Sequence, residues 1–151
     1  LCYWASEYHI DGFRFDLMGV LDIETLNEAR KALLKINPDI IMYGEGWTGG
    51  ESTLPESERG MKINAPRTPG IGMFSDDIRD AVKGHVFYMD ELGFVNGAAD
   101  RGEELKQAVT CAKWAKSPMQ SINYLSCHDN YTLWDRFIIS IHMRVKRCVS
   151  V

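Results

Sequence analysis

The sequence predicts an α/β fold built on a parallel sheet. Two short runs, 9–18 and 40–45, have the apolar character of strands, and a helical pattern over 22–35 separates them. The run 40–45 stays apolar up to Glu45, which is typical of a parallel strand that is covered on both faces. Strands that alternate with helices favour a parallel sheet, although the pattern alone does not distinguish an open sheet from a closed barrel.

The remaining elements continue this alternation. Residues 1–8 have the pattern of the end of a helix, Asp22 is the expected N-cap of the next helix, and Pro38 follows its end. Residues 47–72 form a long loop rich in Gly, Pro, Ser and Thr, a length that indicates a functional or mobile segment. After it we expect a strand at 71–74, helices over 76–83 and 103–116, and a last strand over 122–127.

Composition limits the possible functions. The chain has 151 residues and a net charge of −4, with no basic stripe, so nucleic acid is not an expected partner. No apolar run has the length of a membrane span, so no membrane partner is expected, and residues 1–7 do not form a signal peptide. The first residue is not Met, so we expect the native start to lie upstream.

Four cysteines are spaced irregularly, with no Cys-x-x-Cys pair and no zinc-type spacing. Their apolar neighbours favour reduced, buried thiols over disulfides. Reduced thiols favour a cytoplasmic protein, while secretion stays open. These residues are Cys2, Cys111, Cys127 and Cys148.

Charged and polar residues occur at the ends of three predicted strands: Arg14 with Asp16, then Glu45, then His128 with Asp129. Each has a simple alternative explanation, because Asp16 could cap a helix, Glu45 could be a solvated loop residue, and 128–130 could form a turn. The carboxyl ends of parallel strands meet at one edge of a sheet. Three such ends in order therefore favour one site.

Converging carboxylates repel one another, so one can stay protonated while another stays charged. Glycoside hydrolysis needs this division of labour. Arg14 lies two residues before Asp16, so both side chains point to one side of the strand and the guanidinium keeps Asp16 ionised. Trp47 offers an apolar face for a sugar ring, and His128 offers a donor for sugar hydroxyls.

The residues at these strand ends resemble a known family. Asp-Gly-Phe-Arg-Phe-Asp at 11–16, Tyr-Gly-Glu-Gly-Trp at 43–47 and Ser-Cys-His-Asp-Asn at 126–130 resemble the second, third and fourth signature regions of the α-amylase superfamily, glycoside hydrolase family 13. Gly-Glu-Gly-Trp and the stretches 64–66, 71–84, 93–97 and 130–136 are similar to type I pullulanases, its debranching members. The resemblance extends from Tyr3 to about Phe137.

The resemblance implies a fragment of a (β/α)8 TIM barrel, roughly strands 4 to 7 with their helices. It implies that Asp16 is the nucleophile, that Glu45 is the acid and base, and that Asp129 stabilises the transition state. The nucleophile and the acid of a retaining enzyme lie about 5–5.5 Å apart. Substrate-binding roles are implied for four further residues: Arg14, Trp47, His128 and Asn130.

The implied substrate is an α-glucan such as pullulan, starch or glycogen, cleaved at α-1,6 linkages through a covalent glucosyl-enzyme intermediate. No cofactor is required and no metal ligands are assigned. Some family members hold structural calcium; the sequence does not indicate a site for it, and a calcium requirement stays open. The oligomeric state stays open.

The sequence departs from the family pattern in several places. The first signature, Asp-x-x-x-Asn-His, the motif Tyr-Asn-Trp-Gly-Tyr-Asp-Pro and an eighth strand are absent. We expect a partial catalytic barrel over 1–137 and an unassigned tail over 138–151, for which a sequence artefact is favoured over a divergent helix or strand. We also expect the isolated chain to be poorly stable and inactive.

Three other functions stay open. Other α-glucan-acting members of the family are isoamylase, glycogen debranching and α-amylase-like enzymes. A non-catalytic carbohydrate-binding fragment is a second class, although all three carboxylates are present here. A metal-dependent hydrolase is a third, although the acidic strand ends lack the spacing of metal ligands.

Overall fold

The computed structural model describes residues 1–149, which divide into two compact units. The first unit comprises 1–74 and 114–122, and the second comprises 75–113 and the chain from 123 onward. The chain therefore leaves the first unit, forms part of the second, returns to the first and ends in the second.

The first unit is organised around a four-stranded sheet in the order β1 (Gly12–Phe15), β2 (Ile41–Gly44), β3 (Gly72–Ser75) and β4 (Ser121–Asn123). Strands β1 and β2 are parallel, as are β2 and β3. Phe15 pairs with Gly44, so β1 and β2 end level with one another. The predicted parallel α/β class is confirmed, whereas closure into a barrel stays a prediction.

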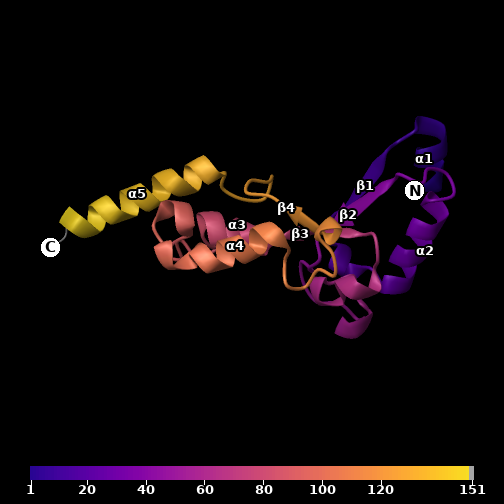
Figure 1. Cartoon of the computed structure of the whole chain (residues 1–151), viewed down its shortest axis with the longest axis horizontal. Coiled ribbons are helices and arrows are strands. Elements are labelled where there is room, and N and C mark those ends of the chain that lie inside the picture. The colour runs from indigo at the N-terminus through magenta and orange to yellow at the C-terminus, as the bar shows by residue number, and fades with distance from the viewer. Residues whose placement is uncertain (150–151) are drawn as a thin grey trace. The chain divides into compact units, whose positions relative to one another are not determined.

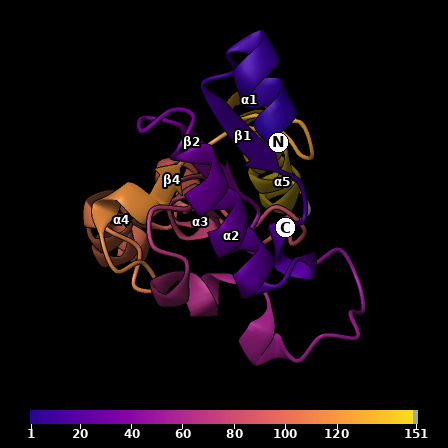
Figure 2. The same cartoon turned by 90° about the vertical axis from the view of Figure 1, so that its right-hand side faces the viewer.

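Helices α1 (Cys2–Tyr8) and α2 (Ile23–Leu33) flank β1, and Figure 1 and Figure 2 show α2 running alongside β1 and β2. The predicted N-cap is confirmed, because the Asp22 carboxylate accepts a hydrogen bond of 2.7 Å from the Thr25 N–H. Helix α2 buries one apolar face against the sheet. The core between them includes Met18, Leu26, Leu33, Met42, Ile71 and Met73.

The long loop after β2 is held by hydrogen bonds to its neighbours. It contains two 3-10 helices, Glu56–Glu58 and Lys62–Arg67. The buried Gln120 side chain donates to Ala65 O at 2.8 Å and to Thr68 O at 3.1 Å. These bonds fix the part of the loop that leads into β3.

The second unit contains α3 (Asp76–Lys83), α4 (Gly102–Thr110) and α5 (Leu133–Val149), shown in Figure 1, with 3-10 helices at Phe94–Asn96 and Ala99–Arg101. Ile78 and Val82 of α3 pack with Ala108 of α4 in a second, smaller core. Helix α3 begins and ends where the sequence predicts. The residue that follows its last turn is Gly84, which has a φ of 85°, a conformation that favours glycine.

Two predicted elements are too long. The helix predicted over 103–116 ends at Thr110, because the Thr110 hydroxyl donates to the carbonyl of Gln107 at 2.8 Å and Cys111 is extended. The strand predicted over 122–127 ends at Asn123. Beyond it, the Tyr124 hydroxyl accepts a hydrogen bond from Arg79 and the Ser126 hydroxyl accepts one from the Leu133 N–H. These contacts hold 124–126 within the second unit.

Residues 138–149 continue α5 without a break across the predicted boundary at 137. The last two residues of the predicted tail lie outside the described residues. Among the described cysteines, Cys2 is exposed and Cys111 and Cys127 are partly exposed, so the predicted burial is wrong. Helix α1 buries only Ala5, which leaves Cys2 open to solvent. The Cys148 side chain lies outside the described part of the chain.

Candidate active site

Arg14 joins two of the predicted catalytic carboxylates. Its Nη1 lies 2.5 Å from Asp16 Oδ1, and its Nη2 lies 2.6 Å from Glu45 Oε1. Arg14 is in β1, Asp16 follows β1 directly, and Glu45 follows β2 directly. The structure therefore brings these three residues together at the carboxyl ends of neighbouring parallel strands, as the sequence predicts.

Asp16 and Glu45 have different surroundings. The Asp16 side chain is 66% exposed, whereas that of Glu45 is 4% exposed. Glu45 Oε1 accepts from Arg14, and Glu45 Oε2 accepts a hydrogen bond of 2.7 Å from the Leu17 N–H. Asp16 is thus an exposed carboxylate, whereas Glu45 is buried and accepts one hydrogen bond on each oxygen. Two carboxylates in such different surroundings can take different chemical roles.

Backbone geometry allows this close approach. Gly44 precedes Glu45, and a Cβ at Gly44 would lie 2.5 Å from the carbonyl oxygen of Phe15. After Asp16 the chain turns back over the end of β2, where the Gly19 N–H donates to the carbonyls of Glu45 and Trp47 at 3.2 and 3.1 Å. The segment after β1 is thus attached to the segment after β2.

Aromatic side chains border the carboxylates. The Arg14 guanidinium lies 5.7 Å from the centroid of the Phe74 ring, and Phe74 makes an edge contact with Tyr43. The predicted sugar platform, Trp47, is partly exposed, and the Lys62 ammonium lies 5.8 Å from its ring centroid. A sugar ring on that face of Trp47 would have to share it with Lys62.

The other predicted site residues belong to the second unit. His128 and Asp129 are both exposed, and His128 Nε2 lies 3.1 Å from Asp129 Oδ1. The Asn130 side chain accepts a hydrogen bond of 2.7 Å from the Tyr131 N–H and donates to the Val86 carbonyl at 3.4 Å. Asn130 therefore stabilises its own turn, and the substrate-binding roles of these residues stay predictions.

Buried charges in the second unit have structural partners. Lys83 donates to the Tyr131 carbonyl at 2.6 Å, and burial lowers the pKa of its ammonium. Burial also lowers the pKa of Arg136, which donates to the carbonyls of Tyr88, Met89 and Glu91. Both cations hold loop backbone in place.

Arg79 and Tyr124 form a second polar contact in this unit, with Arg79 Nη1 2.8 Å from Tyr124 Oη. Burial raises the pKa of Tyr124 to about 12, although the charge of Arg79 opposes part of this effect. Burial lowers the pKa of Arg79, but the adjacent Asp80 carboxylate outweighs it and raises that pKa above its ordinary value. The phenol therefore stays neutral and the guanidinium stays charged at neutral pH.

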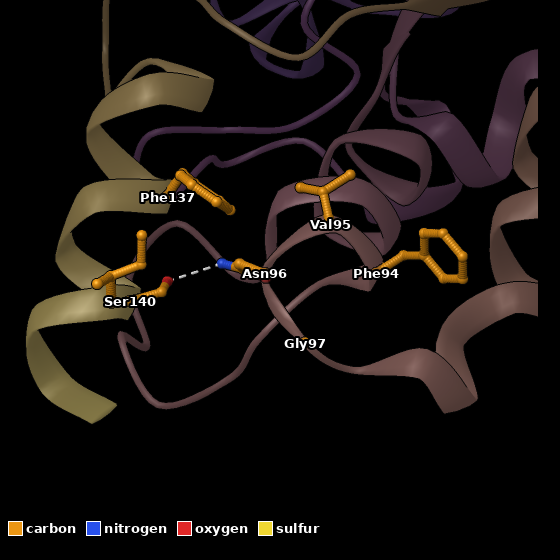
Figure 3. Close-up of a pocket in the computed structure, with 7 residues that line it drawn as sticks. Phe94, Val95, Asn96, Gly97, Phe137 and Ser140 are labelled. Carbon is orange, nitrogen blue, oxygen red and sulfur yellow. Dashed lines mark hydrogen bonds between the residues drawn. The ribbon is translucent and has the colours of Figure 1, made fainter. Parts of the chain in front are cut away.

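A cavity of about 210 Å³ lies in the second unit, and Figure 3 shows its lining. Asn96 projects from the 3-10 helix Phe94–Asn96 and donates to the Ser140 hydroxyl of α5 at 2.8 Å. The remaining lining residues are mainly apolar, and none is a predicted site residue. They are Phe94, Val95, Gly97, Phe137 and Ile141.

Among the side chains that the structure describes, no group of three or more His, Cys, Asp or Glu residues is arranged to hold a metal ion. Among residues 1–149, no helix is long and apolar enough to cross a membrane.

Sequence reasoning missed two contributors to the first-unit site. Leu17 holds Glu45 through its backbone N–H, which no side-chain motif reveals. Phe74 lies beside Arg14, and its position at the end of the short strand predicted over 71–74 was a signal that could have identified it.

The chain is similar to pullulanases over most of its length. No family model matches it. The pullulanase of Bacillus subtilis (strain 168) is 40% identical over 146 residues, which make up 92% of this chain and 20% of that protein. The chain thus spans about a fifth of the length of this curated relative.

Solved structures give the same result. A pullulanase from Anoxybacillus sp. LM18-11, complexed with maltotetraose, superimposes with a TM-score of 0.88 at 44% identity, covering 93% of this chain and 21% of that one. A pullulanase from Paenibacillus barengoltzii, in complex with maltohexaose and α-cyclodextrin, gives 0.84 at 47% identity, covering 93% and 23%. The chain is a homologue of pullulanases over most of its length, consistent with part of a type I pullulanase domain.

Proposed function

We propose that the protein carrying this chain is a retaining glycoside hydrolase that cleaves α-1,6 branch linkages in α-glucans. The observation that carries the proposal is the Arg14 guanidinium, which holds the Asp16 and Glu45 carboxylates at the ends of two adjacent parallel strands. Similarity to pullulanases at 40% identity or more supports the debranching class. The malto-oligosaccharides bound in the neighbouring structures support an α-glucan as the ligand.

The different exposures of the two carboxylates support different roles. In the first step, an Asp16 oxygen attacks the anomeric carbon and the bond from that carbon to the O6 of the next glucose breaks. Glu45 gives its proton to this departing oxygen. In the second step, Glu45 takes a proton from a water molecule, whose oxygen attacks the anomeric carbon and releases the Asp16 carboxylate.

The other predicted residues have supporting roles in the proposal. Arg14 orients both carboxylates through one ion pair to each. Asp129 and His128 bind sugar hydroxyls and favour the transition state, Trp47 contacts a sugar ring, and Asn130 maintains the turn that carries Asp129. No cofactor takes part in these steps. In this proposal the sheet supplies strands 4 to 7 of an eight-stranded barrel.

Substrate specificity tests the debranching assignment. The full-length protein is incubated with pullulan, starch and amylose, and the products are separated by chromatography. We expect maltotriose from pullulan and no attack on amylose, because only pullulan and branched starch contain α-1,6 linkages. Hydrolysis of amylose instead would indicate an α-1,4-acting member of the family.

A substitution at Asp16 tests the mechanism. Removing a nucleophile costs several orders of magnitude in rate, so we expect Asp16→Asn to lower kcat on pullulan by about 10³-fold or more. The matched control is Asp39→Asn, an exposed carboxylate that precedes β2, at the opposite end of this strand from Glu45. Unchanged hydrolysis in Asp16→Asn would exclude Asp16 as the nucleophile.

A further inference from the structure

The backbone at Leu17 has an unusual conformation. Only His9 and Leu17 among the described non-glycine residues have a positive φ, and Leu17 lies in the left-handed region with φ 42° and ψ 48°. This region is disfavoured for a residue with a Cβ and is adopted when surrounding contacts enforce it. Leu17 directly follows Asp16, so the strained residue lies inside the candidate site.

The conformation has a specific consequence for Glu45. Leu17 donates its N–H to Glu45 Oε2 at 2.7 Å, while Arg14 donates to Oε1 at 2.6 Å. The Glu45 side chain is 4% exposed, so solvent offers few alternative donors. Two different donors, one on each oxygen, determine both the position and the rotation of the carboxylate.

The Leu17 side chain packs against the loop that follows Trp47. A Cβ built at Gly49 would lie 2.8 Å from Leu17 Cδ1, so the leucine side chain lies against the backbone of the loop that follows Trp47. Gly19, two residues later, donates to the Glu45 and Trp47 carbonyls. These contacts on both sides hold the left-handed turn in place.

We propose that Leu17 is a positioning residue for Glu45: its left-handed backbone directs its N–H at Oε2 and fixes the carboxyl in one orientation beside Arg14 and Asp16. The inference rests on the proposed function, in which Glu45 delivers and removes the proton. Proton transfer depends on the placement of the donor atom, so loss of this turn reduces the rate of the chemical step more than it weakens substrate binding.

The test compares variants of the full-length protein on pullulan. In Leu17→Val, a β-branched side chain disfavours the left-handed region, and we expect kcat to fall by about tenfold or more with KM changed by less than about twofold. Leu17→Gly adopts the same φ without steric cost and keeps the N–H, so we expect kcat to recover to within about threefold of the wild type.

His9→Val is the matched control. His9 also has a positive φ, of 52°, but it is exposed at the end of α1. This substitution introduces the same backbone conflict away from the carboxylates, so we expect a lower melting temperature with kcat unchanged.

If Leu17→Val does not fold, as judged by circular dichroism, Leu17→Ala replaces it, with a smaller expected fall in kcat. A wild-type kcat in folded Leu17→Val, or in Leu17→Ala where it replaces that variant, would overturn the proposal. A fall in kcat of the same size in His9→Val would also overturn it.

A spectroscopic measurement separates this proposal from the proposed function. The protein is labelled with 15N-leucine, and the Leu17 amide signal is identified by its absence in Leu17→Gly. We expect this signal to move to higher field in Glu45→Ala, because the N–H loses its acceptor. An unmoved signal would refute the Leu17–Glu45 contact even in an active enzyme. A moved signal in a protein without glucanase activity would retain the contact and refute only the function.

Discussion

At the scale of single residues, Asp22 stabilises α2 as its N-cap. Its carboxylate accepts hydrogen bonds from the N–H and the hydroxyl of Thr25, and these bonds lower its pKa. A lowered folded-state pKa contributes stability above the ordinary value of 3.8, and this stability is lost as the pH falls through the folded value.

In the full-length protein, we therefore expect Asp22→Ala to lower the melting temperature at pH 7, with a smaller difference from the wild type at pH 3. Thermal unfolding followed by circular dichroism at the two pH values measures this effect. Asp22→Asn keeps a capping oxygen and is expected to retain most of the stability at pH 7. The same loss in Asp22→Ala at both pH values would show that the charge of the cap is unimportant.

Lys83 gives a pH dependence of the same sign in the alkaline range. Burial lowers the pKa of Lys83, so between its folded value and the ordinary 10.5 the unfolded chain binds more protons than the folded chain. The contribution of Lys83 to folding stability consequently rises as the pH increases through that window.

In the full-length protein, we expect Lys83→Met to reduce this rise in urea-denaturation free energy between pH 7 and pH 10, because methionine carries no proton to lose. Lys106→Met is the control, since the Lys106 side chain is 75% exposed and pairs with Glu103 on the surface of α4. An identical pH dependence in the wild type and in Lys83→Met would contradict the burial argument.

At the scale of elements, the pairing of β1 with β2 determines where the first-unit carboxylates lie. Gly44 pairs with Phe15, and an added Cβ would be 2.5 Å from the Phe15 carbonyl oxygen and 2.9 Å from its Cβ. The side chain cannot be accommodated unless the strands separate, and such overpacking costs roughly 1–3 kcal/mol.

Gly44→Ala is therefore expected to lower the unfolding free energy by that order of magnitude and to reduce activity, because Glu45 is the next residue. Gly50→Ala is a suitable control, since a Cβ at Gly50 would have no heavy atom within 4 Å. Denaturation and pullulan hydrolysis measured in both variants test the prediction. Equal behaviour of the two variants would show that the strands can separate without cost.

Elements were predicted best where local signals act alone. Helix α3 has acidic residues in its first turn and Gly84 after its last residue, and it was predicted with the correct bounds. The predicted end of β4 is wrong because side chains distant in sequence hold the residues that follow it, whereas the predicted end of α4 is wrong although the contacts at Thr110 are local. Arg79, for example, donates to the Tyr124 hydroxyl 45 residues away.

At the scale of the whole molecule, the two units have separate cores, and in the described part of the second unit the buried core cluster consists of Ile78, Val82 and Ala108. Strand β1 has no described strand on its outer side. Small cores and an open parallel edge provide limited stabilisation.

We expect residues 1–151 expressed alone to show no cooperative thermal transition and no pullulan hydrolysis. Sustained turnover by the isolated chain would contradict this expectation.

The sequence by itself determined the α/β class, the N-cap of α2 and the positions of Asp16 and Glu45 at strand ends. These features depend on hydrophobic period, capping residues and local motifs, all of which are written in short stretches of chain. The assignment of catalytic roles came from the resemblance, because each carboxylate taken alone also had a structural explanation.

Only the tertiary structure decided that Arg14 contacts both carboxylates, that Glu45 is buried while Asp16 is exposed, and that the Leu17 N–H binds Glu45. Arg14 and Glu45 are 31 residues apart, and the pairing of β1 with β2 brings them together. Burial and backbone donors depend on how strands and loops pack in space, and a sequence pattern does not specify those distances.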